Sequence, residues 1–235
     1  MDTYSQALRN YHENKEPDYY EIIRDDGYSS IIPLSVFFDA SSFSELELLA
    51  LDKSKGKVLD VGAGAGRHSI ELQRRKMDVT AIDISEEAVN IMKNRGVDKV
   101  IHSDVMDLSG LKFDTLLMLM NGIGMVGSPL RLNDFLINAK QLLTKEGILI
   151  FDSIDVFETS SPKHVSYREN NILKKQLPGQ QKLKINYGGT VGKWFDWLHI
   201  SYAEATKLAE RNGFSSTLLK EECNGQYLAV LQSKI

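Results

Sequence analysis

Cysteine, long apolar runs and dense basic clusters are scarce in this chain of 235 residues, and each scarcity excludes a class of protein. The single cysteine, Cys223, forbids an internal disulfide and a cysteine-based zinc cluster. No apolar run approaches the ~18 residues that indicate a membrane span, and no secretion signal opens the chain. A net charge of −4 without a Lys/Arg block disfavours nucleic acid as a partner. We therefore expect a cytoplasmic protein with no membrane partner.

The five histidines are spread along the chain with no close pair at the spacing of metal ligands, so we predict no metal site. His68 begins the helix that follows a glycine-rich turn, and we expect it to face solvent. His199 lies between an aromatic segment and the last predicted helix, which makes it a candidate general base. A base must lie within hydrogen-bond reach of the proton that it removes, so this assignment depends on geometry.

The most informative pattern is residues 58–69, an apolar strand-like run that breaks into three alternating glycines and then begins a helix. Dinucleotide sites usually space these glycines as G-x-G-x-x-G, whereas the spacing here is G-x-G-x-G. Arg67 occupies the position of the third dinucleotide glycine, and Asp60 precedes Gly62 by two residues. An acidic side chain there repels a pyrophosphate and suits a cationic group. The loop therefore favours a nucleotide-like ligand with a positive end.

Polar residues follow the next three strand-like runs as well. Asp83 ends a run twenty-one residues after Gly62, the spacing at which a carboxylate reaches ribose hydroxyls in nucleotide-binding β-α-β units. Asp104 follows the run 99–103, and Asn121-Gly122-Ile123-Gly124 follows the run 113–120. Each feature alone also fits a turn or a helix cap. Four of them at the carboxyl ends of successive strands predict one shared binding site.

These motifs resemble those of the class I S-adenosylmethionine-dependent methyltransferases, over about residues 57–154 and again from residue 201 onward. The resemblance implies S-adenosylmethionine as cofactor and S-adenosylhomocysteine as product, with Asp104 at the adenine amino group. It implies in-line displacement of the methyl group with no covalent enzyme intermediate. The cofactor-binding residues that it implies are Asp60, Gly62, Ala63, Gly64, Arg67, Asp83, Ile84, Asp104, Val105, Asn121 and Gly122.

Strands and helices alternate from Lys57 onward, which predicts an α/β fold with a Rossmann-like, doubly wound sheet of about seven strands, mostly parallel. Asn224-Gly225 separates two strand-like runs and predicts a C-terminal hairpin, whose last strand is antiparallel to its neighbour. We expect an N-terminal helical cap over residues 1–52. The methyltransferase domain then spans residues 53–235, with a substrate-side segment inserted at 156–200.

Aromatic residues are concentrated in the cap and in the inserted segment. The insert begins polar and loop-like, and then predicts a β-hairpin that turns at Gly188-Gly189. Tyr28, Trp194 and Trp197 are the candidate acceptor-binding residues of these two segments. The same aromatic density also fits a packed core or the face of a homodimer, and these alternatives stay open.

The function that these features favour is methyl transfer to a small-molecule acceptor. Enzymes that methylate nucleic acid bases or glutamine often carry Pro-Pro-aromatic after the first residue of motif IV, whereas Gly122-Ile123-Gly124 stands here. A nucleic-acid or protein methyltransferase, or a non-catalytic S-adenosylmethionine-binding module, is the alternative. An NAD-dependent oxidoreductase is disfavoured by the glycine spacing and by the C-terminal hairpin. The sequence does not decide whether oxygen, nitrogen, sulfur or carbon is methylated.

Overall fold

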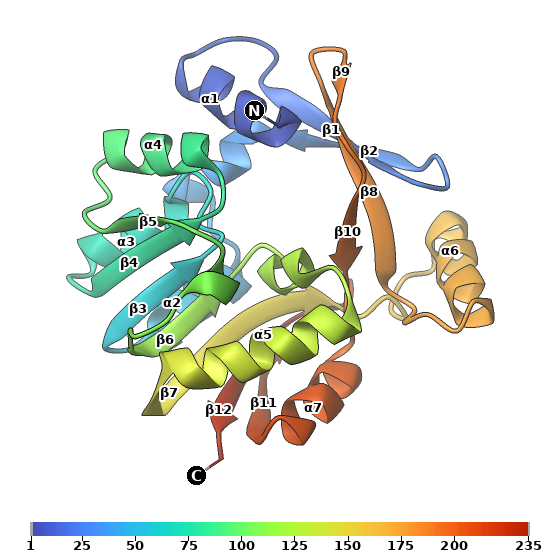
Figure 1. Ribbon diagram of the computed structural model, residues 1–235. Coiled ribbons are helices and arrows are strands. Elements are labelled where there is room, and N and C mark those ends of the chain that lie inside the picture. The colour runs from blue at the N-terminus through green and yellow to red at the C-terminus, as the bar shows by residue number, and fades with distance from the viewer. Residues whose placement is uncertain (1, 235) are drawn as a thin grey trace.

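The computed structural model describes residues 2–234, and its largest element is a sheet of seven strands (Figure 1). The strand order is β11-β12-β7-β6-β3-β4-β5. The parallel strands are β3 (Lys57–Val61), β4 (Asp78–Asp83), β5 (Val100–His102), β6 (Phe113–Met118) and β7 (Leu143–Ile154). The C-terminal hairpin consists of β11 (Phe214–Glu221) and β12 (Gln226–Ser233), and β12 is antiparallel to both of its neighbours. The predicted sheet is confirmed.

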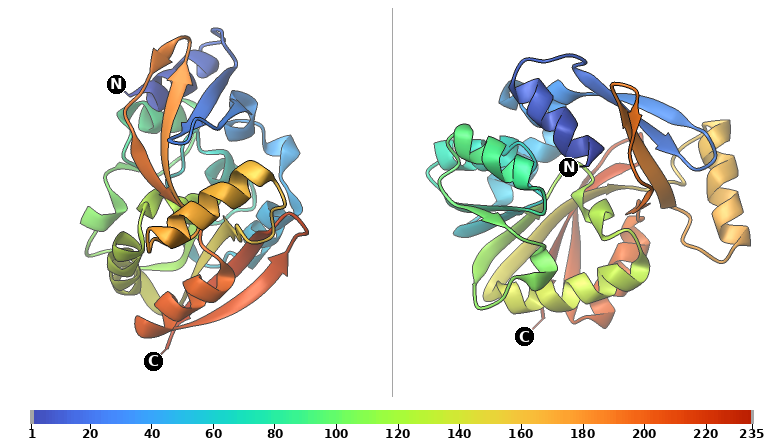
Figure 2. Two further views of the ribbon diagram at one scale, coloured as in Figure 1. Left: turned by 90° about the vertical axis from the view of Figure 1, so that its right-hand side faces the viewer. Right: turned by 45° about the horizontal axis from the view of Figure 1, so that its top comes forward.

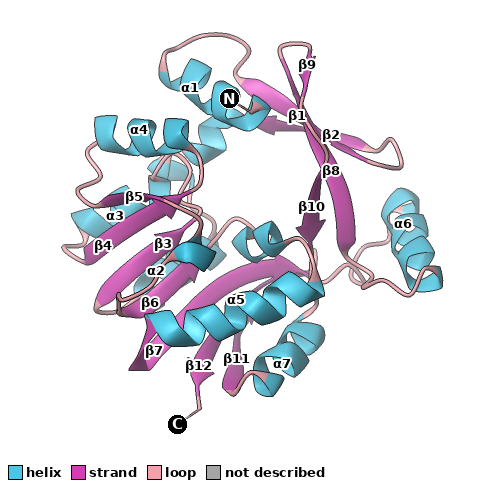
Figure 3. Ribbon diagram, viewed as in Figure 1, coloured by secondary structure: helices cyan, strands magenta, loops and turns pink. Residues whose placement is uncertain are grey.

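Helices cover both faces of this sheet (Figure 3). They are α2 (Glu45–Lys53), α3 (Arg67–Arg74), α4 (Glu86–Asn94), α5 (Pro129–Leu142) and α7 (Tyr202–Arg211). Serine caps begin four of them, as at Ser85, whose hydroxyl accepts from the Ala88 amide. At Ser201 the hydroxyl accepts from the Glu204 backbone N–H, while the Glu204 carboxylate pairs with Lys207 instead of turning back to the cap.

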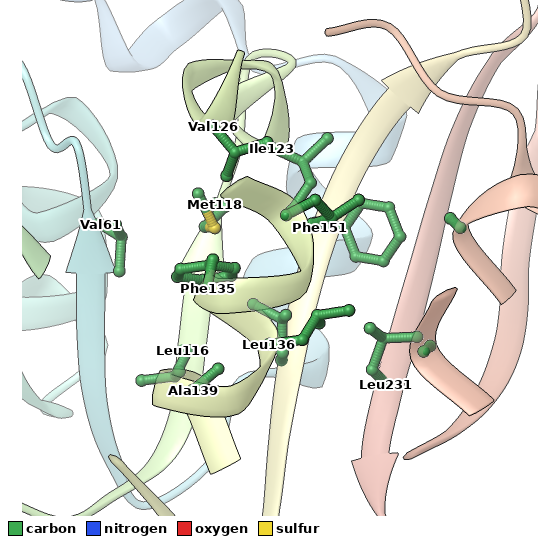
Figure 4. Close-up of a cluster of buried hydrophobic side chains, with 14 of the residues drawn as sticks. Val61, Leu116, Met118, Ile123, Val126, Phe135, Leu136, Ala139, Phe151 and Leu231 are labelled. Atoms are coloured by element: carbon green, nitrogen blue, oxygen red, sulfur yellow. The ribbon is translucent and has the colours of Figure 1, made fainter. Parts of the chain in front are cut away.

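The core is divided by the sheet because successive residues of a strand point to opposite faces. Leu116 and Phe151 pack with Phe135 of α5 on one face (Figure 4). Leu117 and Ile150 pack on the other face with α2 and α3. Parallel strands that are buried on both faces consist of nearly continuous apolar residues, which is why the runs were recognisable in the sequence.

A second sheet joins the N-terminal cap to the inserted segment (Figure 2). Its order is β10-β8-β1-β2, with β9 paired to β8. The predicted hairpin is confirmed as β8 (Gln180–Tyr187) with β9 (Thr190–Val191) and β10 (Phe195–Leu198). The cap contains the helix α1 (Thr3–His12) and also β1 (Tyr19–Arg24) and β2 (Ser29–Pro33), which the sequence analysis did not predict. Two short strands are marginal alone, and β1 depends on pairing with β8.

One further helix lies in the segment that was expected to be a loop. The helix α6 (Pro162–Leu173) lies beside β8 (Figure 1), and the side-chain amide of Asn171 donates to the backbone carbonyl of Gln180 at 2.7 Å. Pro162 stands in its first turn as Pro129 does in α5, so a start signal was present, although Ser161 makes no capping hydrogen bond as Ser128 does. Across residues 2–234, the longest and most apolar helices still fall short of what a bilayer crossing requires.

Candidate cofactor and acceptor site

A cavity of about 1790 Å³ lies between the carboxyl ends of the parallel strands and the second sheet. Ligands of open α/β sheets bind at this edge, outside the carboxyl ends of the strands. Pockets for one small ligand are roughly 300–1000 Å³. The cavity is therefore large enough for two ligands side by side.

The glycine loop after β3 is held by hydrogen bonds within the protein. Gly62, Gly64 and Gly66 all have positive φ, of 69°, 56° and 78°. The Gly62 and Ala63 amides donate to the Ile82 carbonyl at 2.9 and 3.2 Å, and the Gly64 amide donates to the Asp83 carboxylate at 2.9 Å. Because these N–H groups are already used, the loop does not form the N–H cradle that binds phosphate.

Asp83 ends β4 and lines the cavity. Its second carboxylate oxygen accepts from the Ser85 amide at 2.8 Å, so this side chain joins the glycine loop to the start of α4. Burial raises the pKa of Asp83, while its two backbone hydrogen bonds oppose the rise. Ile84 follows, is 71% exposed, and lines the same cavity. A carboxylate beside an apolar surface suits a ribose joined to a flat base.

The remaining predicted cofactor residues divide into two groups. Gly62, Arg67, Asp104, Val105 and Asn121 line the cavity with Asp83 and Ile84. As far as residues 2–234 define its lining, four predicted residues lie outside it: Asp60, Ala63, Gly64 and Gly122.

Asp60 is 2% exposed, and its carboxylate accepts from the Ser69 hydroxyl at 2.6 Å. Burial raises the pKa of Asp60, and the Ser69 hydrogen bond opposes the rise. Asp60 therefore fastens the start of α3 beneath the loop, and its binding to the methionine end, directly or through water, stays a prediction.

A buried ionic cluster stands next to the loop. Glu47 on α2 accepts from His68 Nε2 at 2.8 Å and pairs with Arg67 Nη1 at 3.0 Å. Burial alone raises the pKa of Glu47, but hydrogen bonds from His68 and Ser44 bring it below its ordinary value. The expectation that His68 faces solvent is wrong, since its side chain is 6% exposed and stacks on Phe43. The pattern around the glycines gave no sign that α2 would supply a carboxylate there.

Arg67 is 4% exposed and has unused hydrogen-bond donors. Its Nη1 also donates to the Val36 carbonyl at 2.7 Å. Within the described residues, 2–234, its buried Nε and Nη2 have no hydrogen-bond partner. Because a buried guanidinium is costly unless its donors are satisfied, this geometry points to an anionic group of a ligand.

The turn after β6 is strained in a way that is common at functional sites. Met120 and Asn121 are consecutive non-glycine residues with φ of 62° and 57°. The backbone N–H of Asn121 donates to Asp152 Oδ1 on β7 at 2.8 Å, and this hydrogen bond holds the turn. Burial raises the pKa of Asp152 to about 6. The sequence analysis placed Asp152 at the end of a strand but did not recognise it as part of the site.

The candidate acceptor-side residues Tyr28, Trp194, Trp197 and His199 all line the cavity. The Trp197 indole lies directly on Gly124, where an added Cβ would be 2.4 Å from the ring. His199 is partly buried, and burial lowers its pKa to about 4, so its imidazole is neutral at physiological pH. No partner for His199 Nδ1 exists among residues 2–234. A pKa this low makes His199 a weak base.

The N-terminal helix α1 closes the cavity over the glycine loop, a contact that the sequence did not reveal. A Cβ at Gly64 would be 3.4 Å from the Tyr4 hydroxyl, and Tyr4 packs edge-on against Tyr20 and Phe37. Ser5 of α1 hydrogen-bonds the capping Ser85 of α4 at 2.8 Å. Aromatic residues from the cap therefore shield the loop from water.

Comparison with known proteins agrees with this geometry. The sequence model of a family described as methyltransferase domain matches residues 52–213. A SAM-dependent methyltransferase of Bacteroides fragilis, solved in complex with S-adenosyl-L-homocysteine, has 30% identity and a TM-score of 0.87, covering 100% of this chain and 95% of its own. A SAM-dependent methyltransferase of Methanosarcina mazei shares the fold at 17% identity, with a TM-score of 0.63, over 83% of this chain and 100% of its own.

A curated relative, the putative methyltransferase YqeM of Bacillus subtilis, is 26% identical over 104 residues. That match spans 42% of each of the two chains. The family match covers more than half of this chain, and the Bacteroides fragilis relative matches it along its full length. The chain therefore belongs to the S-adenosylmethionine-dependent methyltransferases.

Proposed function

We propose that the cavity holds S-adenosylmethionine along the carboxyl ends of β3 to β6 and a small-molecule acceptor against the second sheet. The single observation that carries this proposal is one continuous cavity. Asp83, Asp104 and Asn121 line it together with Tyr28 and Trp197 from the two flanking segments. Donor and acceptor therefore share one space, as in-line transfer requires.

Each cofactor residue has a role that follows from its position. Asp83 accepts hydrogen bonds from the ribose hydroxyls, and Ile84 packs on the base. Asp104 accepts from the adenine amino group, with the Val105 backbone at the ring edge. Arg67 binds the methionine carboxylate through Nε and Nη2, the buried donors that have no partner within residues 2–234.

The bound cofactor supplies a methyl group that is already electrophilic on its sulfonium. The chain must therefore position the acceptor and exclude water, rather than activate the methyl group. Tyr4, Tyr20 and Phe37 close the cavity on the side of the cap. Asn121 stands at the end of β6, where motif IV lies beside the methyl group in the family that the chain resembles.

A small-molecule acceptor is supported by the shape and lining of the acceptor side. Ile22, Ile32, Leu183 and Trp197 line it from the second sheet, together with the charged residues Arg24 and Asp196. An apolar pocket with a few polar groups is typical of small-molecule sites. We propose that residues 1–52 and 156–200 select the acceptor, while the rest of residues 53–235 binds the cofactor.

Calorimetry with S-adenosylhomocysteine tests this proposal. Asp83→Ala should weaken binding by ~1.5–3 kcal/mol, the effect of losing a hydrogen bond to a charged group. That loss is a roughly 10- to 150-fold increase in Kd. Asp107→Ala is the matched control, because Asp107 is exposed and lies outside the cavity lining drawn from residues 2–234. Equal affinity of the Asp83 variant, or tighter binding of NADH by the wild type, would refute the assignment.

A further inference from the structure

Two residues with hydrogen-bond acceptor groups, Asn121 and Asp152, line the cavity where the methyl group is expected. Asn121 Oδ1 is buried and has no partner in the part of the chain that the structure describes, residues 2–234. Asp152 is 8% exposed and lines the same cavity, and its Oδ1 accepts from the backbone N–H of Asn121. Among residues 2–234, no side chain donates a hydrogen bond to Asp152 Oδ2.

The backbone holds these two side chains together. Asn121 follows β6 and Asp152 lies near the end of β7, and the two strands are paired in parallel up to Met118 and Phe151. The 2.8 Å hydrogen bond then joins the two residues beyond the last pair. The sheet therefore places Asp152, and the hydrogen bond holds the turn that carries Asn121 against it.

The surroundings of Asp152 favour a cationic or proton-donating group. Glu47 on α2 adds negative charge, His68 on α3 opposes it, and Tyr227 on β12 lies within electrostatic range. Burial is the main cause that raises the pKa of Asp152, to about 6. The side chain is therefore ionised at neutral pH, yet it gains a proton more easily than an exposed carboxylate.

We infer that Asn121 and Asp152 bind the nucleophilic atom of the acceptor, that this atom is the nitrogen of a primary amine, and that Asp152 accepts its proton. This inference rests on the proposed function, because it places the methyl group beside Asn121. A primary amine has two N–H bonds and one lone pair. Holding both hydrogens on the two acceptor groups leaves the lone pair free to point at the methyl carbon, whereas a hydroxyl satisfies only one of them.

The step balances without another reactant. The amine enters as an ammonium ion and gives one proton to Asp152 Oδ2, which passes it to solvent and is again ionised. The neutral nitrogen keeps two N–H bonds, which Asn121 and Asp152 hold. That nitrogen forms a bond to the methyl carbon while the carbon–sulfur bond breaks, and the electron pair of the broken bond goes to sulfur. The products are a secondary ammonium ion and the neutral thioether.

The acceptor class can be identified before the acceptor itself is known. The wild-type protein is incubated with S-adenosylmethionine carrying a ¹³C methyl group and with a metabolite extract from cells. The ¹³C chemical shift of the product then distinguishes N-methyl from O-, S- and C-methyl groups. We expect an N-methyl signal. An O-, S- or C-methyl product, or no product from protein that binds S-adenosylhomocysteine, would overturn the inference alone. Failure to bind S-adenosylhomocysteine would overturn the proposed function and the inference together.

Asp152→Asn tests the proton transfer. The side-chain amide oxygen of the new Asn can still accept from the backbone N–H of Asn121, so the turn is kept. The carboxylate that accepts the proton is lost. The methylation rate should fall by about 10²–10⁴-fold, with the Kd for S-adenosylhomocysteine unchanged. The rate of this variant should also recover as pH rises, because the amine then arrives neutral, and a purely structural role predicts no such recovery. A wild-type rate, or a loss that pH does not relieve, would contradict the role of Asp152.

Two further variants complete the experiment. Asp155→Asn is the matched control, because Asp155 follows β7, lies outside the cavity lining formed by residues 2–234, and uses its carboxylate to accept from the Phe157 amide. It should leave the rate unchanged. Asn121→Gly removes the other acceptor group and tolerates the positive φ of 57°. It should lower the rate while S-adenosylhomocysteine still binds.

Discussion

Asp152→Asn should make the protein more stable, even though it should slow the reaction. Folding raises the pKa of Asp152 from 3.8 to about 6, mainly through burial. A shift of one pKa unit corresponds to about 1.36 kcal/mol, so a shift of about two units corresponds to about 3 kcal/mol. Because Asn cannot ionise, the variant avoids this cost and keeps the hydrogen bond from Asn121.

The sign and the pH range of this effect follow from linkage. The folded pKa lies above the unfolded one, so the folded state binds the proton more tightly and loses stability as pH rises from about 4 through about 6. The variant should therefore exceed the wild type by about 3 kcal/mol at pH 8 and by about half of that at pH 5.

Urea denaturation at the two pH values measures the difference in the free energy of unfolding. The gain at pH 8 corresponds to a rise in Tm of ~6–12 °C for a chain of this size. Asp155→Asn, at a less buried carboxylate, should show no comparable gain. A variant that is no more stable than the wild type at pH 8, or a gain of equal size at pH 5, would refute the reasoning. Higher stability with lower activity is the expected trade-off at a strained functional site.

Three other substitutions test separate parts of the site. Ser44→Ala removes the cap of α2 and should lower the free energy of unfolding by ~1 kcal/mol in urea, and no loss would contradict the capping geometry. Arg67→Lys should weaken S-adenosylhomocysteine binding about tenfold but spare adenosine, and calorimetry that finds equal losses would disprove the carboxylate contact. Gly124→Ala places a Cβ 2.4 Å from the Trp197 indole, so tryptophan fluorescence should shift and turnover should fall while S-adenosylhomocysteine still binds. An unchanged spectrum with unchanged turnover would argue against that packing.

Local patterns were sufficient for the central part of the fold. The strand at residues 57–61, the glycine turn and the helix from Arg67 lie within one short segment, so their sequence signals are adjacent. The C-terminal hairpin was predictable for the same reason, because Asn224-Gly225 at the turn brings the two strands together. Asp83 could be placed at the site because its spacing from the glycines is set by a single β-α-β unit.

Features that depend on distant segments were not predictable in the same way. The strands β1 and β2 form with β8, which lies far along the chain, and no local pattern in the cap indicates that partner. His68 was expected at the surface because its helix start resembles an exposed one, but α2 packs over it and supplies Glu47. Asp152 ends an apolar run as Asp83 does, yet only the parallel pairing of β6 with β7 brings it to Asn121.

The sequence by itself determined the methyl donor, because the cofactor motifs sit at the ends of strands whose order follows from alternating β and α segments. Only the tertiary structure decided what surrounds the acceptor. Asn121, Asp152 and Trp197 come from separate elements, and their meeting depends on sheet pairing and on the packing of β10 over Gly124. Burial then raises the pKa of Asp152, and burial follows from the packing of distant segments rather than from the local sequence.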